Sequence, residues 1–337
     1  MTELLDLFSG AGGFSLGASW SGYTVTGVEL DPDAAAVPDT LLTRTLSADV
    51  RELDPHRFIG VDYLHASPPC QTFTKSGGLR KGRQHVEALS AEVARVLSGD
   101  YTLLLDLAEA DERTLLTLEP ARWIAEVQPR AISLEQVPAV LPVWEAYASA
   151  LAAVGYSTWA GYLDAEQYGT PQARRRAWLI ARADGRDARP PRPTHSRYNM
   201  RSPHKLDAGV PKWRTMQDAL PDLDYVYITA GGIAGEGRPR HVDHPAPTIT
   251  GKGAAAWLDS VDQYVRPWPH RPADAGRLDH KAGKAPRNVT PAETGALQGM
   301  PLDYPFAGKV GAQYRQAGNL VPPQVAAAVT AELRGGR

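Results

Sequence analysis

Cysteine is almost absent from this sequence, since Cys70 is the single one among 337 residues. An internal disulfide and a cysteine-rich metal site are therefore excluded, and we expect no bound metal. Two roles remain for the thiol, as a small buried hydrophobe or as a reactive group. Taken alone, the residue favours the structural role, so a reactive role has to be argued from its surroundings.

Signals for export and membrane insertion are also missing. No apolar run approaches the roughly 20 residues of a membrane span. The first six residues contain two acids and no basic residue, which does not fit a secretory signal. Together with the lone thiol, this predicts a cytoplasmic protein. A content of 43% hydrophobic and 22% charged residues is ordinary for a globular chain with a sizeable core.

The net charge is small, but the charged residues are unevenly distributed along the chain. The net charge of −2 gives no reason to expect a polyanion as partner. Between Thr170 and Thr215, however, twelve Lys and Arg residues stand against three acids, whereas segment 100–145 holds nine acids and three arginines. This polarity predicts a basic face that could meet phosphates. A solvated basic linker is the alternative, because residues 189–193 are rich in proline.

Strands and helices alternate in the first half of the chain. An apolar strand over 4–8 enters a glycine turn and a helix through Ser19, and a second strand follows over 23–29. Further strands are expected at 45–49, 61–66, 130–135 and 177–181, and helices at 86–98 and 143–154. This order predicts an α/β fold with a parallel, doubly wound sheet, similar to a Rossmann fold.

The second half is predicted to contain a smaller domain. After about residue 185 the alternation fades into Pro, Gly, Arg and short β-like runs at 225–229 and 247–250. The chain becomes helical again from about 308. We therefore expect a catalytic and cofactor-binding domain over 1–185, completed by 308–337, and a loop-rich domain over 186–307.

The turn after the first strand is a candidate ligand site. Gly10 and Gly12 allow close approach of a ligand to the backbone and to the following helix N-terminus. The spacing is neither G-x-G-x-x-G nor a P-loop. Glu29 and Asp49, each at a strand end, suit a ribose diol and an adenine amino group. An adenosine ligand is therefore favoured over NAD, although a glycine turn without a ligand stays possible.

Three other elements fit the same edge of the sheet. Pro68 and Pro69 stiffen the loop that holds Cys70 at the end of a strand, where an open α/β sheet places its chemistry. Glu135 ends another predicted strand and could act as an acid, although this residue taken alone favours an ordinary surface glutamate. Arg174 and Arg176 alternate on a strand, so they would share a face that could bind a base oxygen, a phosphate or a carboxylate.

These motifs resemble the cytosine-5 DNA methyltransferase family along nearly the whole chain. The matching segments are, in order, Asp6–Gly13, Pro68–Gln71, Glu135–Val137, Gln172–Arg176, Glu293–Pro301 and Gly318–Pro323. Each motif alone is weak or moderate, but six in the family's order are specific.

The resemblance implies a mechanism on a flipped-out cytosine. Cys70 would attack C6, Glu135 would bind the N3/N4 edge, and Arg176, helped by Arg174, would hold O2. The cofactor would be S-adenosyl-L-methionine, bound by a set of residues spread over both ends of the chain: Phe8, Gly10, Gly12, Glu29, Asp49, Pro69, Asn319 and Leu320.

The same resemblance implies a duplex DNA partner. The expected DNA contacts come from the loop after Cys70 and from the small domain: Gln71, Lys75, Arg80, Gly232, Gly235, Thr248 and Thr250. A restriction endonuclease could be its partner in a restriction-modification system, and a monomer is the default expectation.

The chain departs from the family pattern at two positions. Gln136 replaces an Asn, and Ala292 replaces an Arg. Neither removes a group that the chemistry needs, so we expect activity. The alternatives are cytosine-5 methylation of tRNA and a catalytically inactive DNA-binding relative.

Overall fold

The computed structural model describes residues 2–37, 43–73, 83–102, 111–230, 239–251, 253, 255–260 and 284–334. The chain divides into two compact units. Unit 1 comprises Met1–Asp164, Arg175–Arg192 and Val325–Arg337, and unit 2 comprises Ala165–Arg174 and Pro193–Gln324. None of the helices in the described ranges combines the length and hydrophobicity that crossing a bilayer requires.

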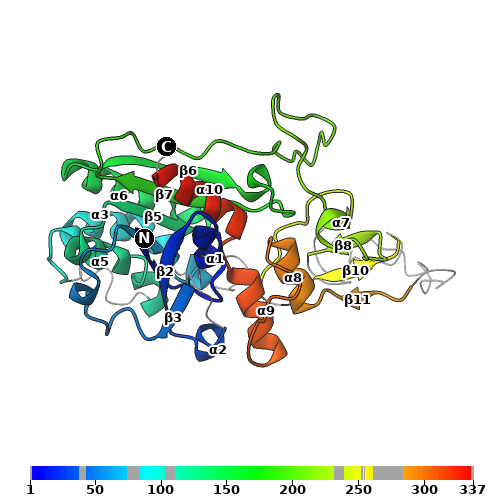
Figure 1. The fold of residues 1–337 in the computed structure, drawn as a ribbon, viewed down its shortest axis with the longest axis horizontal. Helices are drawn as coiled ribbons and strands as arrows, with labels where there is room; N and C mark the ends of the chain where they lie inside the picture. Colours follow the sequence, from blue (N-terminus) through cyan, green and yellow to red (C-terminus); the bar gives the residue numbers. More distant parts are fainter. Residues whose placement is uncertain are drawn as a thin grey trace. The chain divides into compact units, whose positions relative to one another are not determined.

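Unit 1 is built on a seven-stranded sheet with the order β3-β2-β1-β4-β5-β7-β6 (Figure 1). The strands are β1 (Thr2–Leu7), β2 (Tyr23–Glu29), β3 (Thr43–Ser47), β4 (Tyr63–Ala66), β5 (Ala131–Gln136), β6 (Ser157–Asp164) and β7 (Arg175–Arg182). The first five strands of that order are parallel, and β7 runs antiparallel to β5 and β6. The predicted doubly wound α/β fold is confirmed. The reversed strand β7 and the edge strand β6 were not anticipated.

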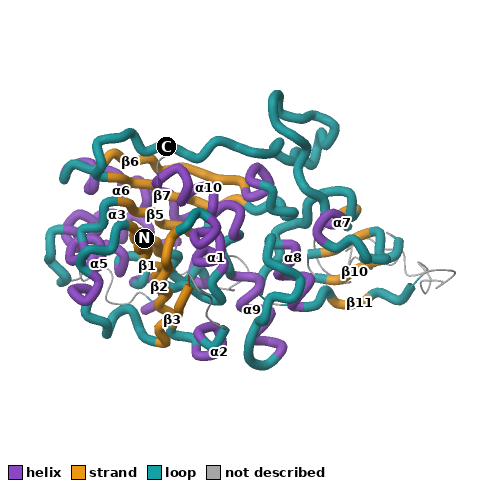
Figure 2. Tube along the Cα trace, viewed as in Figure 1, coloured by secondary structure: helices purple, strands orange, loops and turns teal. Residues whose placement is uncertain are grey.

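Helices flank this sheet (Figure 2). They are α1 (Gly13–Trp20), α2 (Pro32–Ala35), α3 (Val86–Leu97), α4 (Glu112–Leu115), α5 (Glu119–Val127) and α6 (Leu141–Ala153), with α10 (Pro323–Arg334) at the end of the chain. The helices predicted at 86–98 and 143–154 correspond to α3 and α6, but α5 was missed. Helix α10 is tied to the end of α1, because the Thr330 hydroxyl donates to Ser21 Oγ over 2.9 Å.

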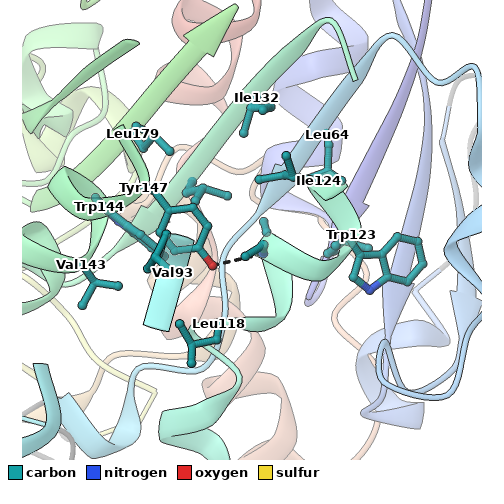
Figure 3. Close-up of a cluster of buried hydrophobic side chains, with 14 of the residues drawn as sticks. Leu64, Val93, Leu118, Trp123, Ile124, Ile132, Val143, Trp144, Tyr147 and Leu179 are labelled. Carbon is teal, nitrogen blue, oxygen red and sulfur yellow. Dashed lines mark hydrogen bonds between the residues drawn. The ribbon is translucent and has the colours of Figure 1, made fainter. Parts of the chain in front are cut away.

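One face of the sheet packs a large apolar core against α3, α5 and α6. Trp123, Trp144 and Tyr147 are fully buried there, and Figure 3 shows them around Leu64, Ile132 and Leu179. The Tyr147 hydroxyl accepts from the amide of Ala121 over 3.1 Å and donates to a backbone carbonyl over 2.9 Å. The polar group of this aromatic side chain is therefore satisfied inside the core.

Unit 2 has a small antiparallel sheet with the order β11-β10-β8-β9. Its strands are β8 (Tyr227–Thr229), β9 (Arg240–His241), β10 (Ala256–Leu258) and β11 (Arg287–Asn288), and its helices are α7 (Met216–Ala219), α8 (Pro291–Leu297) and α9 (Val310–Asn319). The run expected at 225–229 contains β8, whereas residues 247–250 form no strand, so that prediction was wrong. Pro247 supplies no backbone donor, which explains the missing ladder.

The two units and the predicted domains divide the chain at different places. Unit 2 includes α9, while the prediction assigned residues from 308 onward to the catalytic part. The functional roles of the two parts stay a prediction. Ala292, one of the two departures from the family pattern, lies in the first turn of α8, where the Thr290 hydroxyl accepts from the Glu293 amide in a capping box.

Candidate functional site

The strand order of unit 1 reverses between β1 and β4, which is where open α/β sheets bind their ligands. The loops that follow these two strands contain the glycine turn and Cys70. They are joined directly, because the Ser67 amide donates to the Leu7 carbonyl over 3.3 Å and the Ser67 hydroxyl donates to the Phe8 carbonyl over 3.4 Å. The sequence-predicted motifs of these two loops therefore meet at one edge of the sheet.

The glycine turn holds its backbone in unusual conformations. Phe8, Gly10 and Gly12 have φ angles of 59°, 55° and 78°. A Cβ atom built on Gly10 would meet no atom within 4 Å, so open space lies beside the backbone there. Phe8 is a non-glycine residue in the left-handed region, which is uncommon and marks a tightly determined turn. This cradle suits a ligand that lies against the backbone.

Glu29 is fixed at the tip of β2, under that turn. Its carboxylate accepts from the amide of Gly10 over 2.8 Å and from the amide of Asp31 over 2.7 Å. Burial raises the pKa of Glu29 above its usual value, and the two amide hydrogen bonds oppose that rise. A carboxylate held in this way is preorganised to accept hydrogen bonds from a diol.

Asp49 follows β3, and its carboxylate is already paired with the guanidinium of Arg51. The Arg51 guanidinium contacts both of its carboxylate oxygens at 2.6–3.1 Å, and the Arg51 amide donates to it over 2.9 Å. These bonds lower the pKa of Asp49. An adenine amino group at this position would share the carboxylate with Arg51.

Cys70 lies half-buried on the loop after β4, and its carbonyl accepts from the amide of Phe73 over 3.0 Å. Its side chain packs against the edge of the apolar core. Pro69 is also partly buried, and Gln71, which begins a short 3₁₀ turn (Gln71–Phe73), is exposed. The thiol is thus held between the core and the surface, where a nucleophile can be both positioned and reached.

Glu135 and Arg176 form an ion pair at the end of β5. Arg176 Nε lies 3.3 Å from Glu135 Oε1, and both side chains are largely buried, with 15% and 8% of their surface exposed. Arg176 also donates to the carbonyl of Arg175 over 2.8 Å. A carboxylate and a guanidinium side by side offer both an acceptor and a donor to a planar polar ring.

Gln136 joins this pair to the loop of the thiol. Its side chain is only 2% exposed, and its amide nitrogen donates to the carbonyl of Pro68, two residues before Cys70. Its amide oxygen accepts from the backbone amide of Val137. Gln136, which stands where the family has Asn, therefore reaches from β5 to the loop that holds Cys70.

The three consecutive arginines of the Gln-x-Arg-x-Arg motif have different partners. Arg175 forms a bidentate pair with Asp164 on the neighbouring strand, at 2.7 and 2.9 Å. Arg174 lies before β7 and in unit 2, where its buried guanidinium donates to the carbonyls of Gly318 and Leu320 over 3.3 and 3.2 Å. The expectation that Arg174 and Arg176 share a strand face is wrong, because β7 begins only at Arg175.

Two predicted cofactor residues of unit 2, Asn319 and Leu320, lie at the end of α9. Asn319 ends this helix and is exposed, and Leu320 is buried. A Cβ atom at Gly318 would collide with the backbone of Thr250 and Gly251, so this glycine permits close packing of the two segments.

The predicted DNA contacts of unit 2 are described only in part. Thr248 donates its hydroxyl hydrogen to the carbonyl of Ala173 over 2.8 Å, and Thr250 is half-buried. Four other predicted DNA contacts, Lys75, Arg80, Gly232 and Gly235, lie outside the described residues. Within the described ranges, no group of three or more His, Cys, Asp or Glu could hold a metal ion.

Sequence reasoning missed a buried polar row beneath the glycine turn. Asp6, His65 and Ser133 are register partners on β1, β4 and β5, and all three are fully buried. The hydroxyl of Ser133 lies 2.7 Å from His65 Nδ1, and the Ser15 hydroxyl donates to Asp6 over 2.6 Å. Polar residues inside otherwise apolar strands were the available signal.

Comparison with known proteins agrees with the fold and the motif order. The family model described as C-5 cytosine-specific DNA methylase matches residues 2–100 and 106–335. The Type II methyltransferase M1.HphI of Haemophilus parahaemolyticus is 28% identical over 96% of this chain and 84% of its own length. M.NgoMIV of Neisseria gonorrhoeae, also a Type II methyltransferase, is 27% identical over 98% and 96%.

Solved structures show the same fold at low sequence identity. The S. pombe Dnmt2 methyltransferase has a TM-score of 0.61 at 16% identity, covering 99% of this chain and 98% of that one. The Entamoeba histolytica methyltransferase EhMeth has a TM-score of 0.60 at 15% identity, with coverage of 97% and 96%. Because the family model spans nearly all of the sequence, this chain belongs to the C-5 cytosine-specific DNA methylase family and is a DNA (cytosine-5-)-methyltransferase.

Proposed function

We propose that this enzyme methylates C5 of a flipped-out cytosine in a specific duplex DNA sequence through a covalent adduct between Cys70 and C6. The observation that carries the proposal is the largely buried ion pair of Glu135 and Arg176. Gln136, the residue after Glu135 on β5, ties this strand to the loop of the thiol by its hydrogen bond to the Pro68 carbonyl. The acid at the end of β5 and the thiol after β4 follow adjacent parallel strands, and the cation comes from β7, which pairs with β5 in the antiparallel direction.

The nucleophile has to attack a ring that is not activated. Cys70 would add to C6 as the thiolate, although a free thiol with a pKa of about 8.5 is only a few per cent ionised at neutral pH. Glu135 would bind the N4 amino group and deliver a proton to N3, which makes C5 electron-rich. Arg176 would donate to O2 and balance the charge of Glu135.

S-adenosyl-L-methionine fits the cradle and would supply an electrophilic methyl group for C5. Phe8, Gly10 and Gly12 would lie against it, and Glu29 would accept hydrogen bonds from its ribose. Removal of the C5 proton by a base then returns electrons to the ring, and the C6–S bond of Cys70 breaks. Asp49, Pro69, Asn319 and Leu320 are the further residues that we propose for this pocket.

We further propose a division of work along the chain. Residues 1–185 with 308–337 would hold the cofactor and the catalytic groups, and residues 186–307 would recognise the target sequence. The base has to leave the duplex before Cys70 can reach it, at a cost of a few kcal/mol. The names of the relatives support a place among Type II restriction-modification methyltransferases.

The decisive experiment traps the adduct. Fluorine at C5 cannot leave as a proton does, so 5-fluorocytosine DNA should accumulate as a covalent complex with the wild-type enzyme and S-adenosyl-L-methionine. Cys70→Ser should form no complex, and sequencing of methylated DNA should give the target motif. Methyl transfer to tRNA but not to duplex DNA, or full activity of Cys70→Ser, would overturn the proposal.

A further inference from the structure

The segment 196–214 of unit 2, here called the basic loop, has no part in the chemistry described above. It contains neither helix nor strand and is drawn as a continuous teal segment in Figure 2. Five Lys and Arg residues stand in it against one acid, Asp207. It therefore forms a concentrated part of the basic stretch that the sequence showed between 170 and 215.

Hydrogen bonds close the neck of the basic loop. The Ser196 amide donates to the carbonyl of Pro211 over 2.8 Å, and the Ser196 hydroxyl accepts from the amide of Asp207 over 2.8 Å. The carboxylate of Asp207 accepts in turn from the backbone amide of Arg197 over 2.7 Å. The loop's single acid thus serves as a structural acceptor for its own backbone.

Aromatic packing anchors the two ends of the loop in unit 2. Trp213 is 2% exposed, and the ring of Tyr198 packs edge-on against it with centroids 5.1 Å apart. The guanidinium of Arg240 lies 5.0 Å from the centroid of Tyr198, and burial lowers the pKa of Arg240. A loop held at both ends in this way loses little conformational entropy when it binds.

Three cations of the basic loop form no ion pair with an acid of the described residues. Arg201, Lys205 and Lys212 are exposed, and no carboxylate of the described residues lies within 4 Å of their charged groups. Lys212 Nζ lies 5.2 Å from the centroid of the Trp213 ring, which holds it near the neck. Three solvated cations without acidic partners on a preordered loop are a typical surface for phosphates.

We propose that the basic loop binds the phosphodiester backbone of duplex DNA and thereby adds sequence-independent affinity. This inference rests on the proposed function, because duplex DNA is the polyanion in question. Lys and Arg that contact phosphates position a protein on DNA without reading bases. Each contact also releases counterions, so the dependence of binding on salt counts the contacts.

The test removes the three charges and measures DNA binding without methyl transfer. For R201Q/K205Q/K212Q, the slope of log K against log salt should become shallower by about 0.9 per lost phosphate contact, or roughly 2–3 in total. Affinity at about 0.1 M salt should fall at least tenfold on cognate and unrelated duplexes alike. Thermal melting of the variant should match the wild type.

A matched control removes the same charge from unit 1. R44Q/R57Q/R113Q changes three arginines on that unit and should leave the salt slope unchanged. An unaltered slope for the loop variant would overturn the proposal. So would a loss confined to the cognate duplex, which indicates base reading, or a loss seen only with a folded RNA.

Failure of this inference can be told apart from failure of the proposed function. If the wild type methylates duplex DNA and the loop variant keeps its salt slope, only the inference fails. If the wild type transfers no methyl group to DNA, the proposed function fails, whatever the binding slopes are.

Discussion

The two faces of the sheet in unit 1 differ in the polarity of the side chains that they bury, and two adjacent rows of residues show this difference. Leu7, Ala66, Leu134 and Leu179 form one row of register partners, and every one of them is completely buried among apolar side chains. The preceding row on β1, β4 and β5 contains Asp6, His65 and Ser133, which are equally buried. At this level of the sheet, β1, β4 and β5 therefore bury hydrocarbon on one face and hydrogen-bonding groups on the other.

The two faces contribute differently to stability. Apolar packing on the α3, α5 and α6 face contributes to stability in proportion to the area it buries. Buried polar groups on the other face cost desolvation and are tolerated only where they are hydrogen-bonded. The Phe14 ring from α1 stacks on His65 with centroids 3.4 Å apart, so the polar row is covered directly below the glycine turn.

Glu135→Gln should give the largest effect. It keeps the shape of a side chain on the polar face and removes the acid, so we expect the rate of methyl transfer to fall about 10²–10⁴-fold. Stability should change little, because the neutral amide can still bond to Arg176. Single-turnover methylation and thermal melting check the two statements, and a variant with more than a tenth of the wild-type rate would contradict the acid role.

Leu134→Ala tests the neighbouring residue, which points to the opposite face. Leu134 is fully buried, so we expect a loss of about 2–5 kcal/mol in the free energy of unfolding. The folded variant should keep its rate of methyl transfer within about threefold, because no group of the site is lost. Urea denaturation and active-site titration measure these quantities. A large loss of rate with unchanged stability would break the comparison of the two faces.

Asp6→Asn should change how stability depends on pH. Burial raises the pKa of Asp6 to about 7, whereas an unfolded aspartate titrates near 3.9. Between these values the folded state binds more protons, so this group destabilises the wild type as pH rises from about 4 to 7. The change is about 1.4 kcal/mol per pH unit, or on the order of 4 kcal/mol in total.

The variant lacks this contribution, so its stability relative to the wild type should rise over that range and level off above about pH 7. Burial lowers the pKa of His65 well below its usual value, which gives a slope of opposite sign as pH falls below about 6.5. Because His65 is present in both proteins, its effect cancels in the difference. Urea denaturation at several pH values measures the difference in free energy of unfolding between variant and wild type. A difference that stays constant from pH 5 to 8 would rule out the raised pKa of Asp6.

The apolar face was largely predictable from the sequence, whereas for the candidate site only the strand ends that hold its residues could be predicted. Strands such as β2 and β4 appear as apolar runs that end at acids or prolines, which fixes the edge where Glu29 and Cys70 lie. Which side chains of different strands contact each other is not indicated by any local sequence pattern. The ion pair of Glu135 with Arg176 depends on the reversal of β7, and the separate position of Arg174 depends on where that strand begins.

Gln136→Ala should have an intermediate effect. It removes the donor to the Pro68 carbonyl and so loosens the loop of Cys70 from β5. We expect kcat to fall about tenfold with KM nearly unchanged, since small misplacement of a nucleophile is costly. Gln136→Asn, which restores an amide on a shorter arm, should recover part of the rate of adduct formation on 5-fluorocytosine DNA. Equal rates for both variants would argue against this positioning role.

Arg175→Gln should have the smallest effect, although it alters the residue next to Arg176. Arg175 is directed to Asp164, and its side chain is 42% exposed, so solvent screens the pair. Such a pair contributes at most about 1 kcal/mol to stability, and the rate of methyl transfer should stay within about twofold of wild type. Arg176→Gln, one position further along β7, removes the donor beside Glu135 and should lower that rate at least tenfold. If the two variants proved equally impaired, the alternation of β7 would not separate a structural arginine from a functional one, and the contrast between the two faces would fail at this strand.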